Sequence, residues 1–291
     1  YSAEKTFSQF TPRLSASYEL TDDLSTYVSY SKGFKSGGWD MRGDAAITPQ
    51  TVNGYKPEVV DAYEVGLKGY MLDRRISFAS AAFLSKYKDQ QVSTQVVVPS
   101  GIASSIDNAG SSTLYGVEFE AKARLTSSLS ANVALGYIHA EYDTFSRFVP
   151  AGAPNPLNPS QTLTTGQVVN VADLYGFQNT PEWTGNVSLT WVGDVAGGTL
   201  AVTPMVSYRD SYQQFEQPLP LLDQKAFTLV DLTAIWTAPG GHYKLALTGK
   251  NLTDERYRTG GYNFGVATYN NSVIGFYGPP RTVSASLELA F

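Results

Sequence analysis

The chain has 291 residues and a formal net charge of −5; 16% of its residues are charged, 13% are aromatic, and cysteine is absent. No stretch approaches the roughly 18 to 20 consecutive apolar residues of a membrane helix, the lack of cysteine excludes a disulfide-stapled scaffold, and the acidic balance gives no basis for a nucleic-acid partner. What remains is an all-β protein, either soluble or embedded in a membrane as a barrel.

Apolar and polar residues alternate with a period of two along the whole chain, which is typical of β-strands with two different faces. In the last stretch, Val283, Ala285 and Leu287 fall on one face, and the polar residues between them fall on the other. Counting such stretches in chain order predicts about eleven strands. They lie near residues 10–20, 24–36, 58–71, 75–90, 112–124, 129–142, 182–192, 199–212, 226–237, 243–252 and 281–291.

The connections between these strands alternate between short and long. The short ones lie near residues 21–23, 73–74, 126–128, 194–198 and 239–241, and the long ones near 37–57, 91–111, 143–181, 213–225 and 253–280. Outer-membrane barrels have short periplasmic turns, long extracellular loops and strands of roughly 9–11 residues. The pattern therefore favours a transmembrane antiparallel β-barrel over a soluble sandwich.

Aromatic residues are placed near both ends of the predicted strands, as in the two interfacial girdles of a membrane barrel. We expect one girdle beside the short turns, made of Tyr18, Trp191, Trp236, Tyr243 and Phe291. A second group lies toward the long loops: Tyr30, Phe34, Tyr63, Tyr87, Tyr115, Tyr142, Trp183, Tyr208 and Tyr212. The alternative is that aromatic residues are simply common in strands.

The odd number of strands carries a further expectation. Bacterial single-chain barrels have an even number of strands, with both ends in the periplasm. An open sheet of eleven strands would also leave two unpaired edges in lipid, which is prohibitive. We therefore expect residues 1–291 to be the C-terminal portion of a longer barrel, with the chain entering this portion on the extracellular side.

Several segments resemble TonB-dependent outer-membrane receptors. Residues 29–39 (SYSKGFKSGGW) resemble that family's SYSKGF-x-SGG-aromatic segment, and residues 56–68, with PE and YEVGLK, resemble its PE…YE-x-G-x-K strand. Residues 108–118, from NAG to YGVE, resemble a later strand, and residues 250–257 (KNLTDERY) are similar to its NL-x-D-xx-Y motif. With PRT at 280–282 and the terminal Phe291, the resemblance extends over nearly the whole chain.

The resemblance implies a 22-stranded barrel in the outer membrane of a Gram-negative bacterium, with residues 1–291 forming about its second half. It implies a plug domain and a TonB-contacting box upstream, and the TonB complex and outer-membrane lipid as partners. The implied function is active uptake of a scarce nutrient, with a ferric siderophore, a small-molecule metal chelate, as the first candidate. Uptake of cobalamin or an oligosaccharide, a passive porin-like channel, and a soluble sandwich or adhesin are the alternatives.

The chain offers no sign of an enzyme. Acyl hydrolysis or proteolysis needs a positioned nucleophile and base, and neither that arrangement nor a metal-ligand spacing such as HExxH occurs. Of the two histidines, His242 falls in a predicted turn and His139 near the outer end of a strand. We expect no catalytic residues, no bound metal and no cofactor.

Ligand contacts of a receptor should lie on the long loops and the strand ends beneath them. Aromatic and cationic side chains there would suit an anionic, partly aromatic chelate through stacking and charge-assisted hydrogen bonds. The candidates are Lys35, Trp39, Arg42, Arg147, Arg209, Tyr212, Arg256, Tyr257, Arg258, Tyr262, Phe264 and Tyr269. The alternative for each is that Tyr and Arg pack the loops against one another.

Polar residues on the inward face of the strands should line the interior of the barrel. Glu118, Glu120, Lys122 and Arg124 alternate with the apolar residues of one predicted strand. If a plug fills the barrel, they would meet it through hydrogen bonds and ion pairs, and otherwise they would line a water channel.

Overall fold

The structure is a computed structural model that describes residues 4–40, 52–98, 101–149, 151–264 and 272–290. These residues are mainly β-structure, with short 3-10 turns that include Ala172–Leu174 and Pro239–Gly241. Among them, no helix is long and apolar enough to cross a membrane. The strands are β1 (Arg13–Thr21), β2 (Leu24–Lys35), β3 (Glu58–Met71), β4 (Ile76–Val98), β5 (Gly101–Arg124), β6 (Leu129–Val149), β7 (Pro154–Asn155), β8 (Asn158–Thr162), β9 (Gln167–Asn170), β10 (Trp183–Val195), β11 (Gly198–Arg209), β12 (Phe227–Thr237), β13 (Tyr243–Lys250), β14 (Arg258–Phe264), β15 (Ser272–Tyr277) and β16 (Thr282–Leu289).

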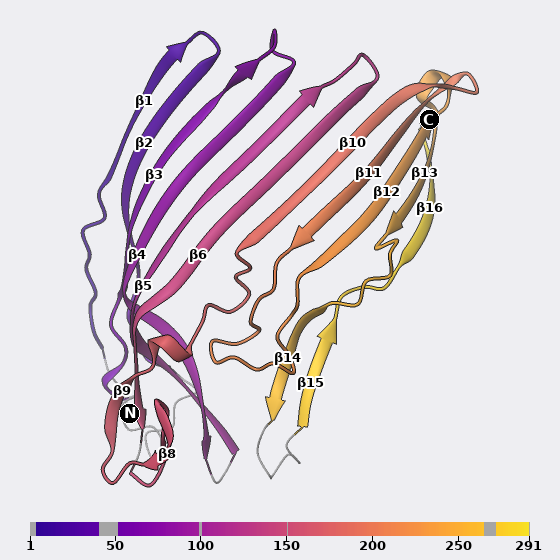
Figure 1. The fold of residues 1–291 in the computed structure, drawn as a ribbon. Coiled ribbons are helices and arrows are strands. Elements are labelled where there is room, and N and C mark those ends of the chain that lie inside the picture. The colour runs from indigo at the N-terminus through magenta and orange to yellow at the C-terminus, as the bar shows by residue number, and fades with distance from the viewer. Residues whose placement is uncertain (1–3, 41–51, 99–100, 150, 265–271, 291) are drawn as a thin grey trace.

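One antiparallel sheet contains all eleven predicted strands, in the order β1-β2-β3-β4-β5-β6-β10-β11-β12-β13-β16. Figure 1 shows them side by side, with the short turns at one end of the sheet and the long connections at the other. β9 pairs with the loop-side end of β6 as a twelfth strand. The predicted strands and their parity are therefore confirmed. Within the described residues the sheet stays open, with β1 and β16 at its edges.

Three strands are longer than the sequence analysis predicts. β4 and β5 continue as a paired hairpin toward the loop side, where Gln91 lies opposite Asn108, and β6 continues to Val149. The register shifts between Tyr87 and Gln90 in β4, and again between Ser111 and Ser112 in β5. Such bulges add a residue and break the period of two, so the alternation stops although the backbone pairing continues. The predicted loops 91–111, 143–181 and 253–280 are therefore partly β-structure.

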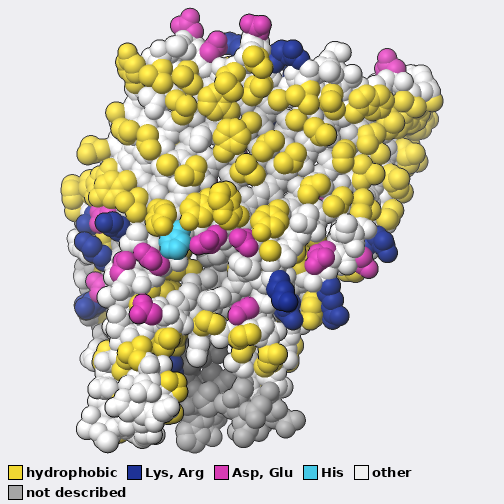
Figure 2. Space-filling model, viewed as in Figure 1, with side chains coloured by type: hydrophobic (Ala, Val, Ile, Leu, Met, Phe, Trp, Pro, Cys, Tyr) yellow, Lys and Arg dark blue, Asp and Glu magenta, His cyan; other side chains and the backbone are white. Residues whose placement is uncertain are grey.

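The register sorts the side chains onto two faces. Val28, Val65, Ala82, Val117 and Tyr137 lie opposite one another on five neighbouring strands, and we call their side the apolar face. Figure 2 shows this face as a broad hydrophobic band, with charged side chains gathered beyond its two edges. A band of this kind suits lipid because acyl chains solvate apolar side chains that water would not.

The opposite side, which we call the polar face, carries the residues that the sequence predicts for the barrel interior. Gly66, Ala81, Glu118 and Gly136 form one of its rows. Glu120 and Lys122 alternate with the apolar residues of β5 and so lie on the same face. The polar face is thus built from charged side chains separated by small ones.

A tightly packed group on the polar face joins β2 to β3. The Tyr27 hydroxyl donates to Glu64 Oε1 at 2.6 Å, and Lys68 Nζ lies 5.0 Å from the centre of the Tyr27 ring. A Cβ atom on Gly66 would come within 2.2 Å of that ring. Glycine at position 66 is therefore what allows Tyr27 to lie across β3.

Candidate functional site

The described residues of the long connections pack into two clusters at the loop side of the sheet. The first, the β6–β9 cluster, has Phe145 and Val171 at its centre, which are 1% and 0% exposed. Asn170 Oδ1 accepts hydrogen bonds from the backbone N–H of Phe145 at 2.8 Å and of Ala172 at 3.2 Å. Tyr142 packs against the cluster where β6 extends past the apolar band, and burial raises the pKa of Tyr142 to about 12. This connection is therefore a small folded unit.

The second, the β14–β15 cluster, joins the segment between β11 and β12 to the hairpin of β14 and β15. Leu222 is 2% exposed and lies against Gly261 of the hairpin, where a Cβ would come within 2.7 Å of it. The Tyr212 hydroxyl donates to the Arg258 carbonyl at 3.1 Å, and the Arg258 N–H donates to Gln224 Oε1 at 2.6 Å. The two connections are thus fixed to each other.

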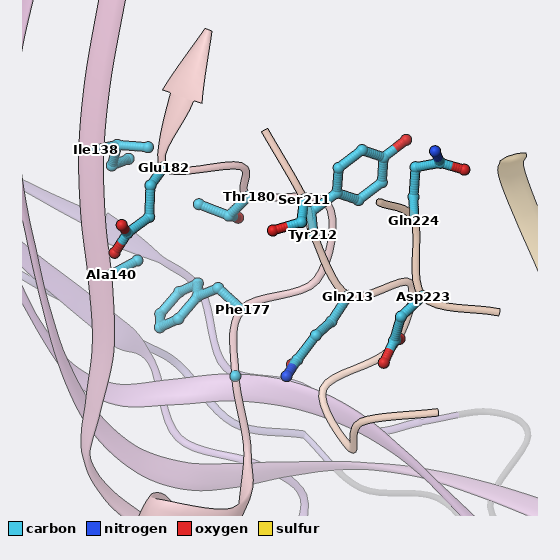
Figure 3. A pocket seen from close by; sticks show the side chains of 11 residues that line it. Ile138, Ala140, Phe177, Thr180, Glu182, Ser211, Tyr212, Gln213, Asp223 and Gln224 are labelled. Atoms are coloured by element: carbon cyan, nitrogen blue, oxygen red, sulfur yellow. The ribbon is translucent and has the colours of Figure 1, made fainter. Parts of the chain in front are cut away.

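A pocket of about 360 Å³ lies between β6 and these connections. Figure 3 shows side chains reaching it from several segments. Its lining is aromatic, amide, hydroxyl and carboxylate: Ile138, Ala140, Gly176, Phe177, Thr180, Glu182, Ser211, Tyr212, Gln213, Asp223 and Gln224. The side-chain oxygen of Gln213 is buried and has no hydrogen-bond partner among the described residues. The pocket therefore presents hydrogen-bonding groups beside aromatic rings.

Glu182 connects this pocket to the apolar face. Its Oε1 lies 2.9 Å from His139 Nδ1, and His139 Nε2 lies 3.6 Å from Glu141 Oε2. The His139 ring also lies 5.1 Å from the ring of Tyr115, at the edge of the hydrophobic band. His139 is accordingly part of a hydrogen-bonded group at the interface.

A wider hollow of about 610 Å³ lies nearby, and its lining includes Glu118 and Glu120 of the polar face. At its loop side the hollow is lined by Arg209, Phe227 and Tyr257. The Phe227 and Tyr257 rings stack with their centres 4.6 Å apart. Two of the predicted ligand residues, Arg209 and Tyr257, therefore lie above the polar face.

The structure brings several predicted residues together, mostly as packing partners. The Arg209 guanidinium lies 5.2 Å from the Tyr212 ring, whose hydroxyl reaches Arg258. Arg256 lies 4.2 Å from the Tyr277 ring, and Tyr262 meets Phe276 edge to face at 5.4 Å. In these contacts the arginine side chains lie over aromatic rings of neighbouring loop segments.

The remaining predicted residues are spread over the loop side. Arg147 donates to the Tyr175 hydroxyl at 2.9 Å in the β6–β9 cluster, and Trp39 donates to the Val52 carbonyl at 3.1 Å. Lys35 ends β2 with an exposed side chain, and Phe264 ends β14, 5.7 Å from Tyr262. Arg42 and Tyr269 lie outside the described residues.

The segment similar to the family's NL-x-D motif stabilises the exit from β13. Asn251 is 4% exposed, and its Nδ2 donates to the carbonyls of Glu255 at 2.8 Å and Pro279 at 3.1 Å. Asp254 Oδ1 accepts from the Arg281 N–H at 2.9 Å. These bonds hold the segment that follows β13, and leads into the β14–β15 hairpin, against the residues that precede β16.

The predicted girdle residues lie beside the short turns on the apolar face. Tyr18, Trp191 and Tyr243 expose 69%, 42% and 55% of their surface, and the Trp236 Nε1–H donates to the Val195 carbonyl at 2.9 Å. Phe291 lies outside the described residues. The described members are thus exposed aromatic residues beside the turns, and Trp236 also has its N–H bonded at the turn, an arrangement that suits an interface.

The polar lining of the 360 Å³ pocket, notably Glu182, Gln213 and Asp223, was not predicted from the sequence. It looked for Arg and aromatic residues, while these acidic and amide residues come from separate connections without a shared motif. Among the described residues, no group of three or more His, Cys, Asp or Glu side chains is arranged to hold a metal ion.

Comparison with known proteins places the chain in a family. A family model described as "TonB dependent receptor-like, beta-barrel" matches residues 1–252. The metal-pseudopaline receptor CntO of Pseudomonas aeruginosa is 28% identical over 298 residues, covering 100% of this chain and 35% of the relative. The pesticin receptor of Yersinia enterocolitica is 26% identical, covering 96% of this chain and 36% of the relative. The chain thus spans about a third of the length of the curated relatives it matches.

Solved structures agree on the fold. The ferric yersiniabactin uptake receptor FyuA from Yersinia pestis superposes with a TM-score of 0.68 at 24% identity, over 96% of this chain and 37% of that one. The copper transporter OprC gives a TM-score of 0.67 at 14% identity, over 96% of this chain and 39% of that one. The chain belongs to the TonB-dependent receptor β-barrel family, whose members are outer-membrane β-barrels of Gram-negative bacteria.

Proposed function

We propose that the full-length protein containing this chain is a TonB-dependent active transporter that takes up a metal chelate of the siderophore class. In this proposal residues 1–291 are the C-terminal portion of the barrel. A plug domain of the same protein occupies the polar face, and the TonB complex acts through the upstream region. The chain itself binds and guides the ligand and catalyses no reaction. A relative named as a metal-pseudopaline receptor supports a chelate as the ligand.

The observation that carries the proposal is the 360 Å³ pocket, held between two packed loop clusters at the loop-side end of the sheet. A pocket built on fixed loops binds more tightly than one that must be ordered by its ligand, because less conformational entropy is lost. Phe177 and Tyr212 offer aromatic surface, and Gln213 adds a side-chain amide to the lining. These are the groups that a chelate with aromatic and amide parts requires.

The proposal revises the role of the predicted cations. Arg256 and Arg258 lie over the Tyr277 ring, at 4.2 and 5.9 Å, and Arg258 also bonds the segment between β11 and β12. We infer that they hold the loops in place, and that the aromatic and amide lining makes the first contacts with the ligand.

Uptake assays on the full-length protein test this function. A strain lacking the gene is complemented with the intact gene, and import of radiolabelled metal is measured with metal-loaded pseudopaline and with ferric yersiniabactin. We expect import of at least one chelate, abolished when TonB is deleted or the proton gradient is collapsed. Import that persists without TonB would favour a passive channel instead. Binding of cobalamin or an oligosaccharide, with neither chelate imported, would favour a non-iron ligand.

A single substitution tests the pocket itself. Gln213→Ala removes this amide from the lining, and the concentration for half-maximal uptake should rise about fivefold, the effect of one lost hydrogen bond. Gln178→Ala is the matched control, because that side chain donates to Glu216 Oε1 at 2.9 Å and does not line the pocket. Equal effects of both variants would count against the pocket as the binding site.

A further inference from the structure

Two lysines stand on the apolar face of β4 immediately beyond the hydrophobic band. Leu84 lies level with Tyr63 of β3 and Tyr115 of β5, and these tyrosines are 47% and 43% exposed. Lys86 and Lys88 follow on the same face toward the long loops, and both are exposed. Residues two apart on a strand are separated by about 6.7 Å, so both ammonium groups lie within reach of the headgroup layer next to the aromatic row.

Neither lysine forms a hydrogen bond or ion pair with the described residues, and in this they differ from their neighbour. Lys32 of β2 lies 3.9 Å from Asp61, and Asp61 also accepts the Tyr30 hydroxyl at 2.8 Å. Asp61 faces Lys86 across the β3–β4 pair, but its contacts are with Lys32 and Tyr30, and it forms no ion pair with Lys86. Lys86 and Lys88 therefore present two free positive charges.

Below the lysines and Leu84, Ser80 and Ala82 form a strip of small side chains on the apolar face of β4. Ser80 and Ala82 are small, while their neighbours on β3 and β5 in the same rows are larger. Val65 and Val117, on either side of Ala82, are 49% and 47% exposed. A lipid chain lying along this strip would contact both valines and bring its headgroup to Lys86.

We propose that Lys86 and Lys88 bind the phosphate of an outer-leaflet glycolipid, with one of its acyl chains lying along β4 over Ala82. The long-loop side of an outer-membrane barrel faces the outer leaflet, so the lysines meet the headgroups of that leaflet. Ammonium groups bind phosphate through charge-assisted hydrogen bonds, and apolar contact adds to this attraction. A free phosphate ion would gain the charge-assisted hydrogen bonds but not the apolar contact of an acyl chain.

On the side of β5 away from β4, the loop-side edge of the hydrophobic band carries acidic side chains and, among the described residues, no such pair of lysines. There Glu141, His139 and Glu182 form their own group, with His139 Nδ1 2.9 Å from Glu182 Oε1. This acidic group repels phosphate, and the site is therefore confined to β4 and its neighbours. The inference does not depend on which ligand the protein transports.

Native mass spectrometry of the full-length protein in a neutral detergent tests the site, with diphosphorylated lipid A as the probe. Two lysines near an anionic headgroup contribute roughly 1 kcal/mol each, so Lys86→Gln with Lys88→Gln should lower the affinity at least about tenfold. Lys86→Arg with Lys88→Arg preserves the charge and should retain most of the binding. A gel mobility shift on heating confirms that each barrel is folded, and Lys88→Gln alone replaces a double variant that fails to fold.

The matched control is Lys68→Gln with Lys122→Gln, which removes two charges from the polar face of the same sheet. This control should leave lipid binding unchanged, and fully dephosphorylated lipid A should bind wild type and variants equally weakly. Equal affinity of the wild type and the Lys86→Gln, Lys88→Gln protein would overturn the proposal. Displacement of the lipid by millimolar inorganic phosphate would show that the site takes free anions, and would overturn the lipid assignment.

Discussion

The sheet and the loop-side clusters bury their apolar side chains in different ways. Every described hydrophobic side chain that is almost fully buried lies toward the loops: Val92, Phe145, Val149, Leu163, Val169, Val171, Ala172, Tyr212, Leu222 and Phe227. On the sheet, large apolar residues such as Val187 and Leu247 expose 43% and 52% of their surface on the apolar face. Lipid replaces a core for the sheet, whereas the loops, which meet water, need a core of their own.

This difference predicts where a lost side chain matters most. Phe145→Ala removes the largest side chain of the β6–β9 cluster, and a cavity of that size costs about 3–5 kcal/mol. Hydrogen exchange should become much faster in residues 143–175, while β10 to β13 keep their protection. The control Val187→Ala shortens a lipid-facing side chain and should leave exchange unchanged throughout. Loss of protection across the whole sheet in Phe145→Ala would show that the two regions are not separate.

A smaller effect is expected where the sheet itself is tightly packed. Gly66→Ala places a methyl group against the Tyr27 ring, and overpacking of this kind costs about 1–3 kcal/mol. The barrel should unfold at a lower temperature, as measured by its heat-dependent gel mobility. Tyr27→Ala in the same protein removes the clash, so the double variant should be less destabilised than the sum of the two single ones. Additive effects would argue against this contact.

The smallest effect is expected at the short turns. Arg74 Nε lies 2.6 Å from Asp23 Oδ1 between two neighbouring turns, but both side chains are about half exposed. Exposed ion pairs contribute little because water and salt screen them. Arg74→Ala should leave the denaturant midpoint of the full-length protein unchanged within error. A clearly lower denaturant midpoint would mean that the short turns, and not the sheet or the loop-side clusters, limit stability.

The sequence could predict much of the sheet because lipid imposes a simple rule on it. One residue in two must be apolar, so the strands from Arg13–Thr21 to Thr282–Leu289 can be recognised by alternation alone. The same rule failed beyond Tyr87 and Ser111, where bulges shift the register and the strands leave the band. The role of Asn251 at the exit from β13 could also be predicted, because two of its side-chain hydrogen bonds are local, to Glu255.

The candidate site was only partly predictable for a related reason. The 360 Å³ pocket takes its lining from β6 and from connections as far apart in the chain as Phe177 and Gln224. No periodicity links these residues, and an Arg or Tyr that packs loops has the same sequence signal as one that binds a ligand. Arg258 is one such residue: it is a predicted ligand contact, and in the structure it is bonded to Gln224 and Asp223.

By itself, the sequence determined the eleven strands of the barrel wall, their antiparallel order and the residues that face lipid, because the bilayer makes each of these strands obey the same local pattern. The tertiary structure decided which loops fold into clusters, which cations they use, and that Lys86 and Lys88 have no ion-pair partner among the described residues. Those features depend on contacts between segments far apart in the chain, and such contacts leave no periodic trace in the sequence.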